Sequence, residues 1–187
     1  MRKAIVSRFQ KIVLSIVVVT LLSGLTVPTA LAQCGVGGKV TGGGQCIVGE
    51  NIEVPSASFG FNAIYFTARD VLKGELNYVD HLTGMHVHVH ELTYLDVWWD
   101  LPGNKPYPLM KAAFGGPCTV TGEIEGEFFA KVYVEDRGEP GTADRFIIQI
   151  VDGSTVIYEG GSGDIDDKGA ASVPILVGNI QIHKPPK

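Results

Sequence analysis

The segment Tyr78–Trp99, YVDHLTGMHVHVHELTYLDVWW, decides the fold because its residues alternate in polarity. Side chains along a β-strand point alternately to the two faces of a sheet, so residues two apart share a face and lie about 6.5–7 Å apart. The valines between the histidines therefore share one face, which suits a hydrophobic core. His86, His88 and His90 share the other face, nearer solvent. The pattern predicts that Met85–Trp99 is the second strand of a β-hairpin.

The turn of this hairpin is expected within Asp80–Gly84, DHLTG, where Gly84 can take a positive φ. The loop length determines which residues face each other across the hairpin. A three-residue loop would place Asp80 opposite His86, whereas a two-residue loop would place His81 there. The sequence leaves both registers open.

The histidine row is a candidate transition-metal site. Two histidines two apart on a strand can share one ion with a further ligand from the neighbouring strand. The ends of the row are about 13 Å apart, so one ion cannot bind all three directly. The expected site uses His86 and His88, or His88 and His90, with Asp80 or His81. The alternative is that these side chains are solvated polar residues on the outer face of a sheet.

A cupin-like or hydrolytic metal centre is one form of this hypothesis. Cupins also carry His-x-His followed by a glutamate, and Glu91 follows here, but the spacing and the glycine positions depart from the cupin pattern. The sequence contains no Gly-x-Ser-x-Gly elbow, no Cys–His pairing motif and no phosphate-binding glycine loop before a helix. A carboxylate pair for glycoside cleavage stays open. The motifs favour a non-catalytic protein.

Residues 1–32 predict a secretory signal peptide. Four cations, Arg2, Lys3, Arg8 and Lys11, precede the apolar run Ile12–Val27, and Ala30-Leu31-Ala32 matches a small-x-small cleavage site. Removing 32 residues from 187 leaves 155, enough for a single domain over 33–187 with its own core. We expect a secreted protein, or a periplasmic one if the envelope has two membranes, with no membrane association after cleavage.

The mature chain is strongly acidic. The leader takes four of the 15 lysines and arginines and none of the 20 acids, which leaves eleven cations and a net charge of −9. This charge excludes nucleic acid and anionic lipid surfaces as partners, and it suits an extracellular ligand, an envelope component or bound cations.

Three cysteines follow the leader, and export permits a disulfide. We expect a Cys46–Cys118 bridge, because both residues lie in predicted strands, although Cys34 could instead pair with Cys46.

Short apolar or alternating runs separated by turn residues predict an all-β, antiparallel sandwich or jelly-roll-like domain. No window shows a capped helical period. The segment Asp100–Pro117 is expected to be a loop insertion. The nine expected strands are Lys39–Val48, Ala57–Ala68, Gly74–His81, Met85–Trp99, Cys118–Glu123, Gly126–Glu135, Arg145–Val151, Thr155–Glu159 and Val177–His183.

Two further sets of residues are candidate binding sites. Carboxylates in glycine-rich turns suit calcium, although neither loop has an EF-hand spacing and ordinary turn chemistry explains such residues equally well. These carboxylates are Asp136, Glu139 and Asp144 in one turn and Asp164, Asp166 and Asp167 in another. Trp98, Trp99 and Tyr107 could form an aromatic platform for sugar rings, as in a carbohydrate-binding module. Adjacent tryptophans on a strand face opposite ways, which favours a core position for at least one.

Four strings, read together, resemble the post-COAP domain family of secreted bacterial and archaeal modules. They are ASFGFN (57–62), GELNYVDHLTG (74–84), VEDRGEPGTADRFIIQI (134–150) and GNIQIHK (178–184). The resemblance implies a β-rich extracellular module without assigned catalytic residues, and structural roles for His81 and His183. The histidine row and segment 98–116 depart from the family-like pattern. The sequence thus predicts an exported, non-catalytic binding or structural module, with a metal-binding protein or a carbohydrate-binding module as alternatives.

Overall fold

The structure is a computed structural model, and it describes residues 38–48, 55–100, 109–139, 141–160 and 173–183. The chain divides into two compact units, residues 1–31 and 32–187, and every described residue belongs to the second unit. The expected signal peptide, Cys34, Tyr107 and the acidic loop with Asp164, Asp166 and Asp167 lie outside the described residues.

The described residues form ten antiparallel strands and one short 3₁₀ turn, so the all-β prediction is confirmed. Among these residues no helix is long and apolar enough to cross a membrane. The strands are β1 (Lys39–Cys46), β2 (Ala57–Phe66), β3 (Val71–Asp80), β4 (Met85–Val89), β5 (Tyr94–Asp100), β6 (Leu109–Thr121), β7 (Gly126–Asp136), β8 (Arg145–Asp152), β9 (Thr155–Gly160) and β10 (Val173–His183), with η1 (Gly141–Ala143) between β7 and β8.

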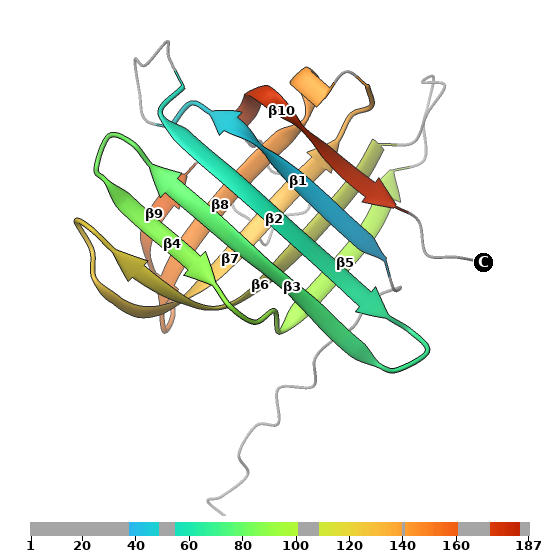
Figure 1. The fold of residues 1–187 in the computed structure, drawn as a ribbon, viewed down its shortest axis with the longest axis horizontal. Helices are drawn as coiled ribbons and strands as arrows, with labels where there is room; N and C mark the ends of the chain where they lie inside the picture. The colour runs from blue at the N-terminus through green and yellow to red at the C-terminus, as the bar shows by residue number, and fades with distance from the viewer. Residues whose placement is uncertain (1–37, 49–54, 101–108, 140, 161–172, 184–187) are drawn as a thin grey trace, which may run out of the picture. The chain divides into compact units, whose positions relative to one another are not determined.

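The strands form two layers that face each other (Figure 1). One layer holds β10, β1, β2, β3 and β4, and the other holds β5 to β9. Strand β6 joins them, because its first half pairs with β5 and its second half pairs with β4. The histidines of β4 therefore lie next to a strand that runs from one layer into the other.

Apolar side chains from alternate positions fill the space between the layers. Phe59 of β2 stacks on Phe146 of β8 with ring centres 4.0 Å apart, and Phe61 packs on Phe114 of β6 at 4.9 Å. Val87 and Val89 of β4 are buried in the same core, while His86 and His90 are exposed. The period-two pattern thus assigned the two faces of β4 correctly.

The expected strand Met85–Trp99 is wrong, since the chain forms two strands there and brings the total to ten. Val89 pairs with Cys118, but Tyr94 pairs with Gly115. The four residues 90–93 on one side thus lie opposite only two, Gly116 and Pro117, on the other, and the two extra residues break the strand between β4 and β5. Because the number of extra residues is even, odd-numbered side chains still point to the core after the break. Leu95 and Val97 are therefore buried, as Val87 and Val89 are.

The loop expected over Asp100–Pro117 is also wrong for its second half, because β6 begins at Leu109. Its glycines and proline suggested a loop, yet this strand pairs with β7 along nearly its whole length. Ala112 and Phe114 alternate into the core. One edge of β6 pairs with β7, and the opposite edge pairs first with β5 and then with β4. Pro117 lies at the change from β5 to β4, where a missing N–H is tolerated.

Candidate functional site

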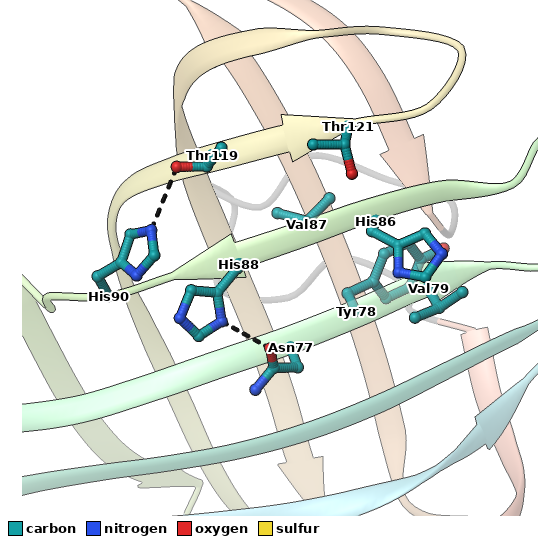
Figure 2. A pocket seen from close by; sticks show the side chains of 9 residues that line it. All are labelled: Asn77, Tyr78, Val79, His86, Val87, His88, His90, Thr119 and Thr121. Atoms are coloured by element: carbon teal, nitrogen blue, oxygen red, sulfur yellow. Dashed lines mark hydrogen bonds between the residues drawn. The ribbon is translucent and has the colours of Figure 1, made fainter.

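A hollow of about 270 Å³ lies on the outer face of the sheet, over β3, β4 and the second half of β6 (Figure 2). The side chains of Tyr78 and Val87 are buried on the opposite, core side of the sheet. The hollow is lined by Asn77, Tyr78, Val79, His86, Val87, His88, His90, Thr119 and Thr121. The three histidines of the sequence pattern are therefore its main titratable groups, and no carboxylate, thiol or amine is among the lining residues that the structure describes.

The hairpin register differs from both expected registers. Asp80 pairs with Met85, so the loop has four residues, and His86 and His88 face Val79 and Asn77. The cause is local: an oxygen of the Asp80 carboxylate accepts the N–H of Leu82 at 2.8 Å and ends the strand. Gly84 then completes the loop at a φ of 69°.

Asp80 and His81, the expected additional ligands, do not reach the histidine row. Asp80 is 2 % exposed and lies on the core side, where it accepts a hydrogen bond from the Tyr158 hydroxyl at 3.1 Å. His81 lies in the turn with its Nε2 3.0 Å from the hydroxyl of Ser58. Within the described ranges, no group of three or more histidines, cysteines or acidic residues is placed to hold a metal ion. A three-ligand site with Asp80 or His81 is therefore not assembled.

His88 is oriented by Asn77, the residue opposite it on β3. The Nδ1 atom of His88 lies 2.6 Å from the amide oxygen Oδ1 of Asn77. An amide oxygen can only accept a hydrogen bond, so Nδ1 carries the proton. The Nε2 atom of His88 is then left with an unprotonated lone pair in the neutral ring.

His90 is oriented by Thr119 and, through it, by Glu127. The Thr119 hydroxyl donates to Oε1 of Glu127 at 2.8 Å, and Nε2 of His90 lies 3.2 Å from the same hydroxyl oxygen. A carboxylate only accepts, so the hydroxyl proton points to Glu127 and the hydroxyl oxygen accepts the Nε2 proton of His90. The lone pair of the neutral His90 ring is therefore on Nδ1.

The two oriented rings lie against each other. Their centres are 4.1 Å apart and their planes are inclined by 76°. In Figure 2 the nitrogen of His90 that is not bonded to Thr119 is turned toward the His88 ring. His86 stands apart from this pair, beside Val79 and Thr121. The arrangement thus selects His88 and His90 from the row of three.

Sequence reasoning missed Asn77, Thr119 and Glu127, which orient the histidines. Asn77 and Thr119 occupy the cross-strand positions on either side of His88, and Glu127 is next to Thr119 on β7. Counting positions from a four-residue loop would have found Asn77. Thr119 and Glu127 could not be placed without the pairing of β6 with β4.

The acidic turn expected to bind calcium holds β10 through hydrogen bonds. Asp144 is fully buried, and its two carboxylate oxygens accept the N–H groups of Arg137 and Ile180, each at 2.8 Å. Asp136 accepts the N–H groups of Gly138 and Ile182, each at 3.0 Å. Glu139 accepts the side-chain amide of Asn179 at 2.9 Å. These carboxylates are hydrogen-bonded to the protein, and a calcium ion in this turn stays a prediction.

The aromatic platform is not brought together by the described residues. Trp98 packs on Tyr133 of β7 with ring centres 6.0 Å apart, on the outer face of the second layer. Trp99 faces the other way and is 43 % exposed. The opposite orientation of the two tryptophans was predicted correctly, but neither belongs to the main core.

The expected Cys46–Cys118 disulfide is wrong, because both residues are buried free thiols. Three strands, β2, β3 and β4, lie between their strands in the sheet order. Burial raises the pKa of the Cys46 thiol to about 12 and that of Cys118 to about 11. Both thiols therefore behave as small apolar side chains of the core.

No protein-family model matches the chain, and neither a curated protein nor a solved structure matches it. The resemblance to the post-COAP family thus rests on the four quoted strings alone.

Proposed function

We propose that this protein is an exported, non-catalytic binding module of the cell exterior. Its ligand-binding surface is the hollow on the outer face of β3, β4 and β6. The observation that supports this proposal is the pair of histidines, His88 and His90, held in fixed orientations on a sheet surface. A purely structural outer face has no need of oriented ring nitrogens. Binding sites, in contrast, use a few positioned polar groups in a concave surface.

The composition of the hollow supports binding rather than catalysis. Its described lining offers imidazoles, an amide, hydroxyls and apolar surface, and no nucleophile paired with a base. The Thr119 hydroxyl directs its proton to Glu127 rather than to a histidine. His90 therefore donates to Thr119 and cannot act as a base toward it.

The test is an NMR titration of the uniformly labelled protein with four probes: zinc chloride, copper(II) chloride, calcium chloride and a soluble xylan. We expect at least one probe to shift amide signals of β3, β4 and β6, and we expect a His88→Ala/His90→Ala double variant to abolish these shifts. The matched control is His183→Ala, which removes an exposed histidine from β10 and leaves the shifts intact. Shifts confined to the other layer, or no saturable shift with any probe, would refute the proposal.

A further inference from the structure

We infer that the ligand of this surface is a transition-metal ion, bound between Nε2 of His88 and Nδ1 of His90. The inference rests on the proposed binding role of the hollow, and it adds the chemical class of ligand and the two ligating atoms. Neutral imidazole nitrogens that carry a lone pair suit Zn²⁺, Cu²⁺ and Ni²⁺.

Asn77 and Thr119 fix the tautomers and orientations of His88 and His90 in the way that metal-binding histidines require. A metal-binding histidine donates its other ring N–H to an oxygen, and this bond fixes the tautomer and the ring orientation. His88 donates from Nδ1 to Asn77, and His90 donates from Nε2 to Thr119. The two rings thus have opposite tautomers. His88 keeps a lone pair on Nε2, and His90 keeps one on Nδ1.

Glu127 completes the arrangement as a positioning residue. Its carboxylate accepts the Thr119 hydroxyl at 2.8 Å, so the hydroxyl is fixed as an acceptor for His90. The chain Glu127–Thr119–His90 is therefore a carboxylate–histidine relay with a hydroxyl between the two groups. A carboxylate in this place makes the imidazole a better ligand and favours a bound cation.

The geometry needs only a small adjustment. Metal–nitrogen bonds of about 2.1 Å place the ring centres of two histidines on a tetrahedral ion about 5 Å apart. The present separation is 4.1 Å. The exposed His90 ring can open this gap by small rotations about χ1 and χ2.

Two protein ligands leave at least two coordination positions of the ion open. Within the described ranges no third histidine, cysteine or acidic residue is placed to complete the set. Water, or donor atoms of a further ligand, would occupy the open positions. The site would therefore exchange its metal readily, and its affinities should follow the usual order, with Cu²⁺ bound more tightly than Ni²⁺ or Zn²⁺.

The experiment is a calorimetric titration of the metal-free protein, purified after expression of the full chain, with copper(II), nickel and zinc chlorides. We expect one ion per chain, tightest binding for copper, and a loss of affinity of about tenfold or more in His88→Ala and in His90→Ala. Glu127→Gln should weaken binding by about tenfold, as losses of orienting partners do. The matched control His183→Ala, which removes an exposed histidine of β10 outside the hollow, should bind as the unchanged protein does.

A spectroscopic readout identifies the ligating atoms. Nitrogen-15 spectra of the histidine rings should show protonated Nδ1 for His88 and protonated Nε2 for His90 before metal is added. Zinc should then shift Nε2 of His88 and Nδ1 of His90. Binding that survives His88→Ala and His90→Ala, or that requires His86, would overturn the inference.

The outcomes also separate this inference from the proposed function. If no metal binds but xylan still shifts the signals of β3, β4 and β6 in a His88-dependent manner, the metal assignment is wrong and the binding role stands. If no probe acts on this face, both are wrong.

Discussion

The phenol oxygens of Tyr78 and Tyr158 lie 2.6 Å apart and join the two layers of the sandwich, the first from the core and the second from a half-buried position against it. The Tyr158 hydroxyl also lies 3.1 Å from Oδ2 of Asp80, which can only accept, so Tyr158 donates to Asp80 and Tyr78 donates to Tyr158. The other oxygen of Asp80 ends β3 and begins the hairpin loop. A buried polar chain therefore connects the core to the loop that sets the register of the histidines.

Tyr158→Phe should destabilise the protein by about 1–3 kcal/mol. The substitution leaves the buried Tyr78 hydroxyl without its acceptor and removes a donor from Asp80, and unmade buried hydrogen bonds carry this penalty. Urea denaturation should show a lower midpoint with an unchanged m-value. The matched control is Tyr65→Phe, whose hydroxyl donates to Asp70 at an exposed site and which should change stability by less than about 0.5 kcal/mol. Equal effects of both variants would contradict the role assigned to the chain.

The buried thiols and phenols should make the fold less stable in alkali. Burial raises the pKa of Cys46 and Cys118 to about 12 and about 11, and burial also raises the pKa of Tyr78 and Tyr158. The unfolded chain therefore releases these protons at lower pH than the folded chain does. Stability is fully present below pH 9.0, the ordinary thiol value, and declines as the pH rises above it. Urea midpoints should fall as the pH is raised from 8 to 10.5, and they should fall less steeply in Tyr158→Phe. A midpoint that does not change with pH would contradict this prediction.

Thiol labelling should distinguish buried free cysteines from a disulfide. In a Cys34→Ser variant, an aromatic disulfide reagent at pH 8 should label neither Cys46 nor Cys118 in the folded protein, because both are buried and protonated. In guanidinium chloride without reductant it should label two thiols per chain. Labelling of none under these conditions would show that the exported protein carries the Cys46–Cys118 bridge.

The alternation of residues predicted the features that depend only on the period of a strand. The burial of Val87 and Val89 and the exposure of His86 and His90 follow from that period, whatever the neighbours are. The register could not be predicted in this way. It depends on one hydrogen bond, from the Leu82 N–H to Asp80, which lengthens the loop and places Asn77 opposite His88.

Local sequence patterns could not predict the positions of Thr119 and Glu127, for a different reason. Thr119 belongs to a strand whose glycines and proline are typical of loops, and long-range pairing with β4 and β7 overrides that composition. Glu127 comes from a third strand. Only the assembled sheet shows that these residues lie beside His90.

Asp144→Asn should loosen the final strand. Both carboxylate oxygens of Asp144 accept backbone N–H groups, and the amide replaces one acceptor by a donor that faces an N–H. We expect a loss of about 1–3 kcal/mol and faster hydrogen exchange at the Ile180 amide. The matched control Asp152→Asn, at the exposed turn between β8 and β9, should leave both quantities nearly unchanged. Unaltered exchange at Ile180 would contradict the assigned bond.

Gly116→Ala should disturb the fold and the histidine pair together. A Cβ at Gly116 of β6 would overlap the carbonyl oxygen of Glu91, the residue after His90, where the chain steps from β4 to β5. The backbone has to move, so we expect a loss of at least about 2 kcal/mol and weaker copper binding. Gly60→Ala is the matched control, since no atom lies within 4 Å of its added Cβ and a strand gains up to about 1 kcal/mol from this change. Urea denaturation and copper titration of both variants check the prediction, and it fails if Gly116→Ala retains the stability and copper affinity of Gly60→Ala.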